Sequence, residues 1–237
     1  PRLAAELRSP WLTTELGARM APACSCSERR QVESLLVEAL TIAAGELRGR
    51  YCPLPGSESH PSSSLTMEEE YGLAKARLLV ADPDSEIAVA SGFARGWPDA
   101  RGLFVSENQR FVASINEEDH LSFTVLDPGG DLKKAFSLFH SVHCALEDSL
   151  RAHGEGFALS KRLGFLGVCP ARLGTCLAVT VALELPRLAG QRAELEAICQ
   201  NLGVRIRPHM VQGKSISKTA SFDIFLQDLL GVSEVQQ

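Results

Sequence analysis

The sequence predicts an α+β fold in which a mainly antiparallel β-sheet is flanked by helices, and three observations lead to this prediction. Apolar residues recur with helical spacing in two long segments, 27–47 and 131–150. Between these segments the pattern changes to a period of two, and short turns separate the alternating runs. The chain has no internal repeat, and its strand runs are interspersed with helices of unequal length. Such a pattern favours an α+β arrangement.

The composition is that of an ordinary globular protein. The chain has 237 residues, of which 45% are hydrophobic, so one large domain or at most two is expected and a wholly disordered chain is excluded. With 24 basic and 29 acidic side chains the net charge is −5, which argues against a nucleic-acid-binding protein. No apolar run reaches the roughly 18–20 residues that span a bilayer, and no signal peptide opens the chain. We therefore expect a soluble, cytoplasmic protein that does not bind membranes.

Seven cysteines form an odd, scattered set along the chain. None of them forms a Cys-x-x-Cys pair, so the spacing does not match a zinc ribbon and no metal site is expected. We expect free thiols in a reducing compartment.

The first part of the chain is expected to hold one helix between less regular segments. Residues 1–27 carry Pro and Gly without a clear period, which predicts an irregular lead-in. Ser27 is the expected N-cap of a helix whose apolar stripe extends to Leu47. Residues 53–64 predict a Pro- and Ser-rich loop, and residues 86–93 predict a buried strand.

The middle of the chain predicts a β-hairpin followed by a long helix. Residues 111–115 and 121–125 both alternate with a period of two, and the acidic segment 116–120 connects them. Residues 127–130 predict a turn, and Asp131 is the expected N-cap of the helix that follows.

The last part of the chain predicts two strands and two helices. Residues 176–185 predict a long strand, and residues 191–202 predict a helix that ends before Gly203. A short strand at 204–207 and a final helix at 222–230 complete the prediction.

The acidic connection of the hairpin is the strongest chemical candidate. Three carboxylates at 117–119 stand beside His120, and their mutual repulsion favours a raised pKa that suits a general base. The same carboxylates could hold a cationic substrate such as a guanidinium. The alternative is a solvated and inert acidic turn, and the spacing alone leaves these interpretations open.

Two further segments each have a chemical and a structural interpretation. Cys169, directly before Pro170, could be a thiol with a lowered pKa or a small buried filler. Segment 92–102 surrounds one Trp and two Arg with Gly and Pro, so it could cradle a ligand or form a structural turn with an internal Arg–Asp pair. No Walker loop, dinucleotide fingerprint or HExxH motif occurs.

Three motifs follow one another along the chain: WPDARG at 97–102, NEEDHL at 116–121 and CPxxLGT at 169–175. With their flanking segments they resemble the phosphagen (guanidino) kinases, the family of creatine kinase and arginine kinase, in family order over about residues 28–230. The resemblance implies the family's large C-terminal catalytic domain over 28–237, an antiparallel sheet flanked by helices. The family's small helical N-terminal domain is not visible in this sequence.

The family transfers the γ-phosphoryl group of Mg-ATP to a guanidino nitrogen, and the resemblance implies which residues would take part. By position, Glu118 matches the catalytic glutamate, Glu117 its acidic neighbour and Cys169 the cysteine beside the substrate. Arg207 matches the arginine that opens the family's flexible loop and is the candidate for nucleotide binding. The loop itself departs from the family, because residues 208–212 are stiffer and bulkier than a Gly-rich loop.

The other positions at which the resemblance implies phosphate-binding arginines hold different residues. Ser122 directly follows NEEDHL and Ala178 lies three positions after LGT, where the family has Arg. Ala182 stands for a family histidine and Ser114 for a tryptophan, and the family's Arg-x-Arg motif has no match in residues 1–27. By analogy with an arginine finger, one lost cation at a transferring phosphoryl group lowers the rate by about 10³–10⁵.

The sequence therefore predicts a catalytically degenerate, phosphagen-kinase-like pseudoenzyme that serves as a structural or protein-interaction module. We expect no cofactor, and we expect other proteins as partners in a larger intracellular assembly, such as a cytoskeletal one, with a homo-oligomer compatible with the resemblance. Two alternatives stay open. One is an active ATP:guanidino phosphotransferase that uses Mg-ATP, and the other is a sensor that binds a guanidino ligand without transfer.

Overall fold

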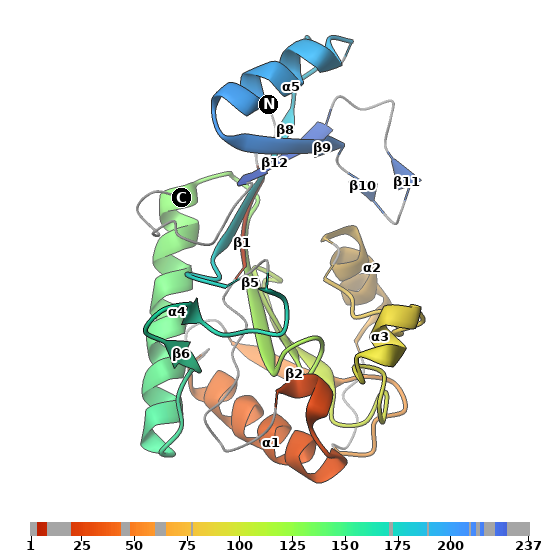
Figure 1. Ribbon diagram of the computed structural model, residues 1–237, viewed down its shortest axis with the longest axis vertical. Helices are drawn as coiled ribbons and strands as arrows, with labels where there is room; N and C mark the ends of the chain where they lie inside the picture. Colours follow the sequence, from red (N-terminus) through yellow and green to blue (C-terminus); the bar gives the residue numbers. More distant parts are fainter. Residues whose placement is uncertain are drawn as a thin grey trace.

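A computed structural model defines most of the chain and centres on one large sheet (Figure 1). The structure describes residues 4–8, 20–43, 48–59, 65–76, 78–170, 173–188, 190–208, 210–211, 214–215 and 221–226. Within these ranges the eight strands of the sheet have the order β2-β3-β4-β5-β1-β8-β12-β9, and every neighbouring pair is antiparallel. The predicted α+β class with an antiparallel sheet is confirmed.

The strands of this sheet are short and come from the whole length of the chain. They are β1 (Ala4–Arg8), β2 (Gly49–Pro53), β3 (Gly102–Ser106), β4 (Phe111–Ile115), β5 (Leu121–Asp127), β8 (Ala178–Glu184), β9 (Val204–Pro208) and β12 (Ser221–Leu226). Two small hairpins pair β6 (Leu159–Ser160) with β7 (Gly164–Phe165) and β10 (Met210–Val211) with β11 (Lys214–Ser215). The helices are η1 (Ala21–Ala23), α1 (Cys26–Ala43), α2 (Met67–Ala76), α3 (Glu86–Ala90), α4 (Leu132–Ala152) and α5 (Arg192–Asn201).

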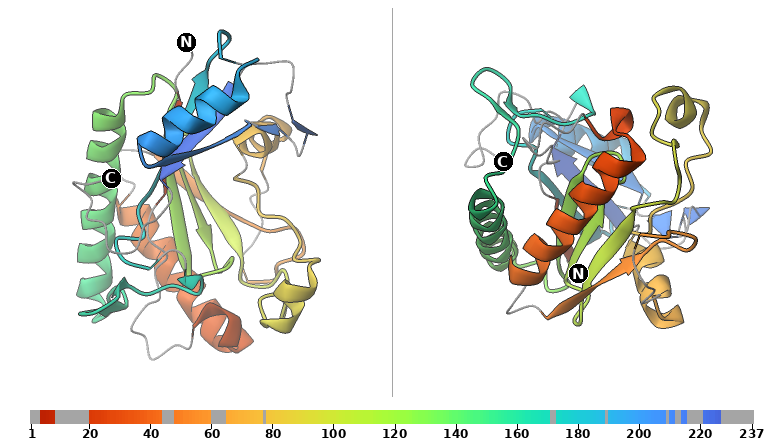
Figure 2. Two further views of the ribbon diagram at one scale, coloured as in Figure 1. Left: turned by 45° about the horizontal axis from the view of Figure 1, so that its top comes forward. Right: turned by 90° about the horizontal axis from the view of Figure 1, so that it is seen from below.

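The main core lies between one face of the sheet and the two long helices α1 and α4 (Figure 2). Its buried members include Val32, Leu36, Leu40, Phe104, Phe111, Phe123, Phe139, Val142, Leu146 and Leu150. Phe123 anchors this core, because its ring centroid lies 5.6 Å from that of Phe111 and 5.0 Å from that of Phe139. Helix α2 covers the opposite face, where Leu73 packs with Leu103 and Val105.

Several predicted elements are confirmed where local signals and sheet pairing agree. Strands β4 and β5 form the predicted hairpin, and the Asp131 carboxylate accepts a hydrogen bond from the Lys134 amide at the start of α4. Strands β8 and β9 and helix α5 match their predicted positions within a few residues. Gly203, with φ of +71°, follows α5 as the sequence indicates.

Two predicted elements have the wrong type. Residues 86–93 are not a strand: Ser85 accepts a hydrogen bond from the Ala88 amide, and the short helix α3 is followed by a turn at 91–100. The predicted final helix at 222–230 is instead strand β12 as far as Leu226, because its backbone pairs with β8 on one side and β9 on the other. Residues 227–230 lie outside the described part.

The beginning of the chain also differs from its prediction. Within the expected lead-in at 1–27, residues 4–8 form β1, a central strand between β5 and β8. The α1 cap is Ser25 rather than Ser27, since the Ser25 hydroxyl accepts from the Glu28 amide and the Ser25 amide donates to the Glu28 carboxylate. The loop after β2 is present at 54–59, and its predicted remainder lies outside the described residues.

None of the helices in the described ranges is both long and apolar enough to cross a membrane.

Candidate functional site

The connection between β4 and β5 is held in place by buried polar side chains. Asn116 has φ of +54°, and its amide nitrogen donates to the carbonyl oxygens of Arg29 at 3.0 Å and Ala100 at 2.9 Å. The backbone N–H of Asn116 donates to the His120 carbonyl oxygen. The Nδ1 atom of the His120 ring lies 3.1 Å from the Asn116 side-chain oxygen. Because Asn tolerates the left-handed conformation better than most residues, this position suits it. The tip is therefore a rigid turn docked on α1 and on the segment before β3.

The three carboxylates of this tip have different surroundings. Asp119 is buried, and its Oδ1 accepts a hydrogen bond from the Val168 amide at 2.8 Å. Glu117 and Glu118 are half-buried. The interpretation of the whole segment as a solvated turn is therefore wrong, since Asn116, Asp119 and His120 are all buried.

The loop that carries Cys169 is tied to the acidic tip. The hydrogen bond from Val168 to Asp119 fixes the residue directly before Cys169, whose thiol is free and half-buried. A second hydrogen bond closes the loop, because the backbone N–H of Phe165, before Cys169, donates to the carbonyl oxygen of Gly174, after it, at 2.8 Å. The structure thus brings Cys169 to the same end of the sheet as Glu117 and Glu118.

The sheet face opposite α1 and α4 carries small, neutral side chains next to this tip. Phe123 and Val179 pack on the main core, so their neighbours Ser122 and Ala178 belong to the other face. Ser122 is opposite Ser114 in the register of β4 and β5. On β8, Ala182 is four residues after Ala178 and therefore belongs to the same face of the sheet.

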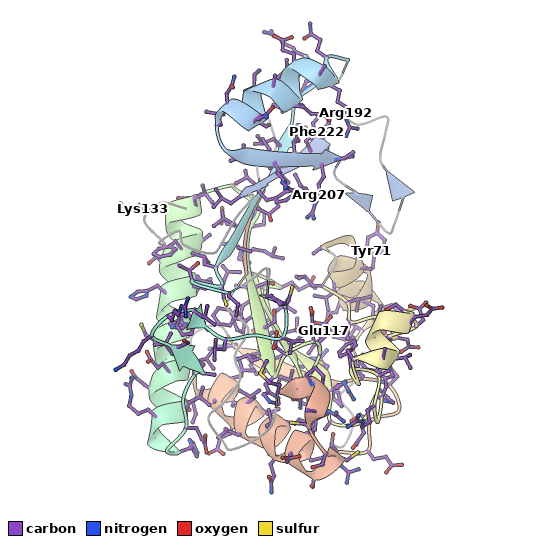
Figure 3. All side chains as sticks on the ribbon, viewed as in Figure 1. Tyr71, Glu117, Lys133, Arg192, Arg207 and Phe222 are labelled. Carbon is purple, nitrogen blue, oxygen red and sulfur yellow. The ribbon has the colours of Figure 1, made fainter. Side chains whose placement is uncertain are left out.

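Arg207 stands on the edge strand β9 and has partners within the sheet. Its Nε donates to the Asp223 carboxylate at 3.0 Å, and its guanidinium carbon lies 5.0 Å from the centroid of the Phe225 ring. Asp223 is buried and lies opposite Ala182 in the register of β12 and β8. Figure 3 shows Arg207 in the upper part of the molecule and Glu117 well below it. The structure therefore places Arg207 apart from the acidic tip.

The segment at 92–102 is a structural turn, although its expected internal ion pair is wrong. Arg101 is buried, and its side chain donates to the carbonyl oxygens of Phe93 at 2.8 Å and Arg95 at 3.2 Å. The Asp99 carboxylate instead accepts from Arg30 on α1, at 3.0 Å from Nε. The described residues contain no group of three or more His, Cys, Asp or Glu side chains arranged to hold a metal ion.

Comparison with known proteins identifies the family to which this arrangement belongs. The sequence model of the ATP:guanido phosphotransferase C-terminal catalytic domain matches residues 31–237. The chain belongs to this family. Its members, the phosphagen kinases, depend on Mg-ATP.

Individual phosphagen kinases agree with this assignment. Creatine kinase M-type of Gallus gallus is 37% identical over 222 residues, and that of Homo sapiens is 36% identical over the same length. These alignments cover 93% of this chain and 55% of each creatine kinase, so the chain spans about half the length of these relatives.

Solved structures show the same fold. The crystal structure of lombricine kinase superposes with a TM-score of 0.85 at 29% identity, covering 98% of this chain and 61% of that one. The duplicated taurocyamine kinase from Schistosoma mansoni, with bound transition state analog components, gives a TM-score of 0.81 at 27% identity and covers 99% of this chain and 30% of that one.

One cationic residue next to the phosphagen-kinase sheet face was missed by sequence reasoning. In the register of the sheet, Arg8 on β1 lies opposite Ala178 on one side and Thr124 on the other. Its segment was expected to be irregular, because residues 1–27 carry Pro and Gly without a clear period. The pairing of β1 with β5 and β8 was the missing information.

Proposed function

We propose that this chain is a catalytically degenerate phosphagen-kinase-like domain that serves as a structural or protein-interaction module. The observation that carries the proposal is the sheet face at Ser122, Ala178 and Ala182, which bears small neutral side chains beside an intact acidic tip. The chain thus keeps the fold of the phosphagen kinases, but this face lacks the cationic side chains that the family pattern implies.

Phosphoryl transfer explains why this change matters. The transition state is loose and spreads negative charge over the transferring oxygens, so catalysis depends on cations that are already in position. Neither the hydroxyl of Ser122 nor the methyl group of Ala178 supplies positive charge. Loss of a single such cation lowers the rate by about 10³–10⁵. Loss of two, at Ser122 and Ala178, is therefore enough to abolish useful turnover, even when the two effects are not additive. These residues do not fit Mg-ATP, and we propose no resident cofactor.

Two arginines on other strands of this sheet, Arg207 and Arg8, do not replace the missing charge. The guanidinium of Arg207 is held by the buried carboxylate of Asp223, which reduces the positive charge available to a phosphate. Arg8 is placed by register opposite Ala178 and represents one cation. Neither arginine changes the fact that the side chains of Ser122 and Ala178 are neutral.

The partners of the module are proposed to be other proteins in a larger cytoplasmic assembly, with a homo-oligomer compatible with the family. Leu132 and Phe136 support an interaction role, because they lie one turn apart on α4 and expose large apolar side chains. Such side chains are favoured in interfaces over open solvent.

A second candidate function is a sensor for a guanidino compound. It is favoured by the rigid tip, which presents Glu117 and Glu118 half-buried beside the loop of Cys169. Two carboxylates in such a position suit a guanidinium, which a carboxylate binds through two parallel hydrogen bonds. Binding of this kind would need no nucleotide.

An ADP-release assay on the full chain separates these functions from an active kinase. With creatine, arginine, taurocyamine and lombricine as substrates, we expect no turnover above that of the Glu118→Gln variant. Turnover that Glu118→Gln abolishes would instead establish an active ATP:guanidino phosphotransferase. Calorimetry with the same four compounds then tests the sensor, for which saturable heat must disappear in the Glu117→Ala/Glu118→Ala variant.

A further inference from the structure

The beginning of α1 carries an exposed cysteine beside the turn at 91–100. Cys26 is the first residue of α1, and among the seven cysteines of the chain it is the exposed one. Its sulfur lies 3.2 Å from the position that a Cβ atom would take at Gly96. The Nη1 atom of Arg29 lies 3.2 Å from that same position. Both atoms therefore border one small space beside Gly96.

The guanidinium of Arg29 has a donor that points to this space. Arg29 is 1% exposed, and its Nη2 donates a long hydrogen bond of 3.4 Å to the Cys24 carbonyl oxygen. Its Nη1 is buried and has no hydrogen-bond partner among the described residues. An unsatisfied buried donor is unfavourable, and more so when it carries charge. An oxygen in the space beside Gly96 would satisfy it.

A second buried guanidinium adds to the positive charge of this region. Burial and the neighbouring Arg29 lower the pKa of Arg101 to about 10. The two arginines thus repel each other, and in the described part of the chain no carboxylate forms an ion pair with either of them. The surroundings of Cys26 therefore favour an anion.

We propose that Cys26 is a site of oxidation by hydroperoxides, and that Arg29 binds the anionic oxygen of the oxidised sulfur. The deprotonated sulfur attacks one oxygen of hydrogen peroxide, so that an S–O bond forms and the O–O bond breaks. The sulfur loses two electrons and the peroxide gains them. The hydroxide that leaves takes the proton of the new sulfenic acid, which gives a sulfenate and one water molecule.

Exposure, charge and the helix terminus act together at this position. Reactive cysteines occupy electropositive and partly exposed surroundings, and the N-terminus of an 18-residue helix adds partial positive charge. Cys144 and Cys169 are only half-buried and serve as internal references, whereas the other four cysteines are buried.

The test is trapping of sulfenic acid on the full chain. The chain is treated with hydrogen peroxide in the presence of dimedone, and the labelling rate of each cysteine is measured by peptide mass spectrometry. We expect Cys26 to be labelled at least about tenfold faster than Cys144 or Cys169, the factor that one charge-assisted hydrogen bond to the oxygen provides when it already forms in the transition state. A Cys26 rate no higher than that of Cys144 overturns the proposal.

A displaced thiol provides the matched control. In the Cys26→Ser/Ser27→Cys variant the thiol stays exposed at the same helix terminus but is rotated by about 100° around the axis, away from Gly96. Its labelling rate should fall to that of Cys144, and an unchanged rate contradicts the role of Arg29. Arg29→Gln should lower the Cys26 rate in the same way. If Arg29→Gln does not fold, the labelling rate of the Cys26→Ser/Ser27→Cys variant decides whether the proposal holds.

Discussion

The two ends of the segment 116–122 differ in what holds their residues in place. At the tip, Asn116, Asp119 and His120 are buried and hydrogen-bonded to α1, to the segment before β3 and to the Cys169 loop. At Ser122, the second residue of β5, the register partner is another small residue, Ser114. The tip therefore contains residues that the fold itself needs, whereas Ser122 is paired with Ser114 through the backbone of β4 and β5. Survival of the tip motif is thus no measure of catalytic activity.

The largest expected effect follows from replacing Asn116. Asn116→Ala removes two buried hydrogen bonds, to the carbonyl oxygens of Arg29 and Ala100, and puts alanine at φ of +54°. We expect a loss of about 3 kcal/mol in the free energy of unfolding, measured by urea denaturation. Asn116→Gly, which accepts this φ, should lose about 1 kcal/mol less.

The control lies one residue along the same tip. Glu117→Ala should lower the free energy of unfolding by no more than about 1 kcal/mol, because Glu117 is half-buried and has no positive φ. Equal losses for Asn116→Ala and Glu117→Ala would remove the distinction between fold-required and replaceable residues.

Restoring positive charge to the sheet face should create nucleotide affinity. In Ser122→Arg/Ala178→Arg, each new guanidinium can form a charge-assisted hydrogen bond with a phosphate, which is worth about 1.5–3 kcal/mol. We therefore expect Mg-ADP to bind at least about tenfold more tightly than to the unmodified chain, by calorimetry. The matched control is Ser34→Arg/Thr41→Arg, which adds the same charge at exposed positions of α1, on the other side of the sheet, and should gain much less. A gain of the same size there would mean that net charge, not position, controls binding.

A smaller effect is expected at the edge of the sheet. Arg207→Ala removes the ion pair with Asp223 and the contact with Phe225. The Arg207 side chain is 48% exposed and solvent screens it, whereas Asp223 is only 6% exposed and would lose the partner of a buried carboxylate, so the loss should stay below about 2 kcal/mol in thermal or urea unfolding. A loss several times larger would show that Arg207 is a structural residue of the sheet and not a former ligand-binding one.

The sequence predicted those parts of the fold in which local pattern and tertiary pairing agree. The β4–β5 hairpin and α4 have strong periodicity and a clear cap, and both are confirmed. Segments 86–90 and 221–226 are short and apolar, so their periodicity does not distinguish helix from strand. Only a Ser85 cap in one case and two neighbouring strands in the other determine their structure.

The candidate site could be predicted only in part for a similar reason. The motifs that carry Glu117, Glu118 and Cys169 led to the correct family and to one end of the sheet. The structural role of Asp119 and the position of Arg8 depend on contacts between residues far apart in sequence, with Val168 and Ala178 respectively. Such long-range contacts cannot be inferred from the local pattern of a single sequence.

A nucleotide needs positive charge on the sheet face, and a titration of the full chain with Mg-ADP tests most directly whether that charge is present. Isothermal calorimetry should give no saturable heat at ligand concentrations up to about 1 mM, which corresponds to less than about 4 kcal/mol of binding free energy. A saturable isotherm with micromolar affinity would contradict the account, because it would show that other side chains supply the positive charge that Ser122 and Ala178 lack.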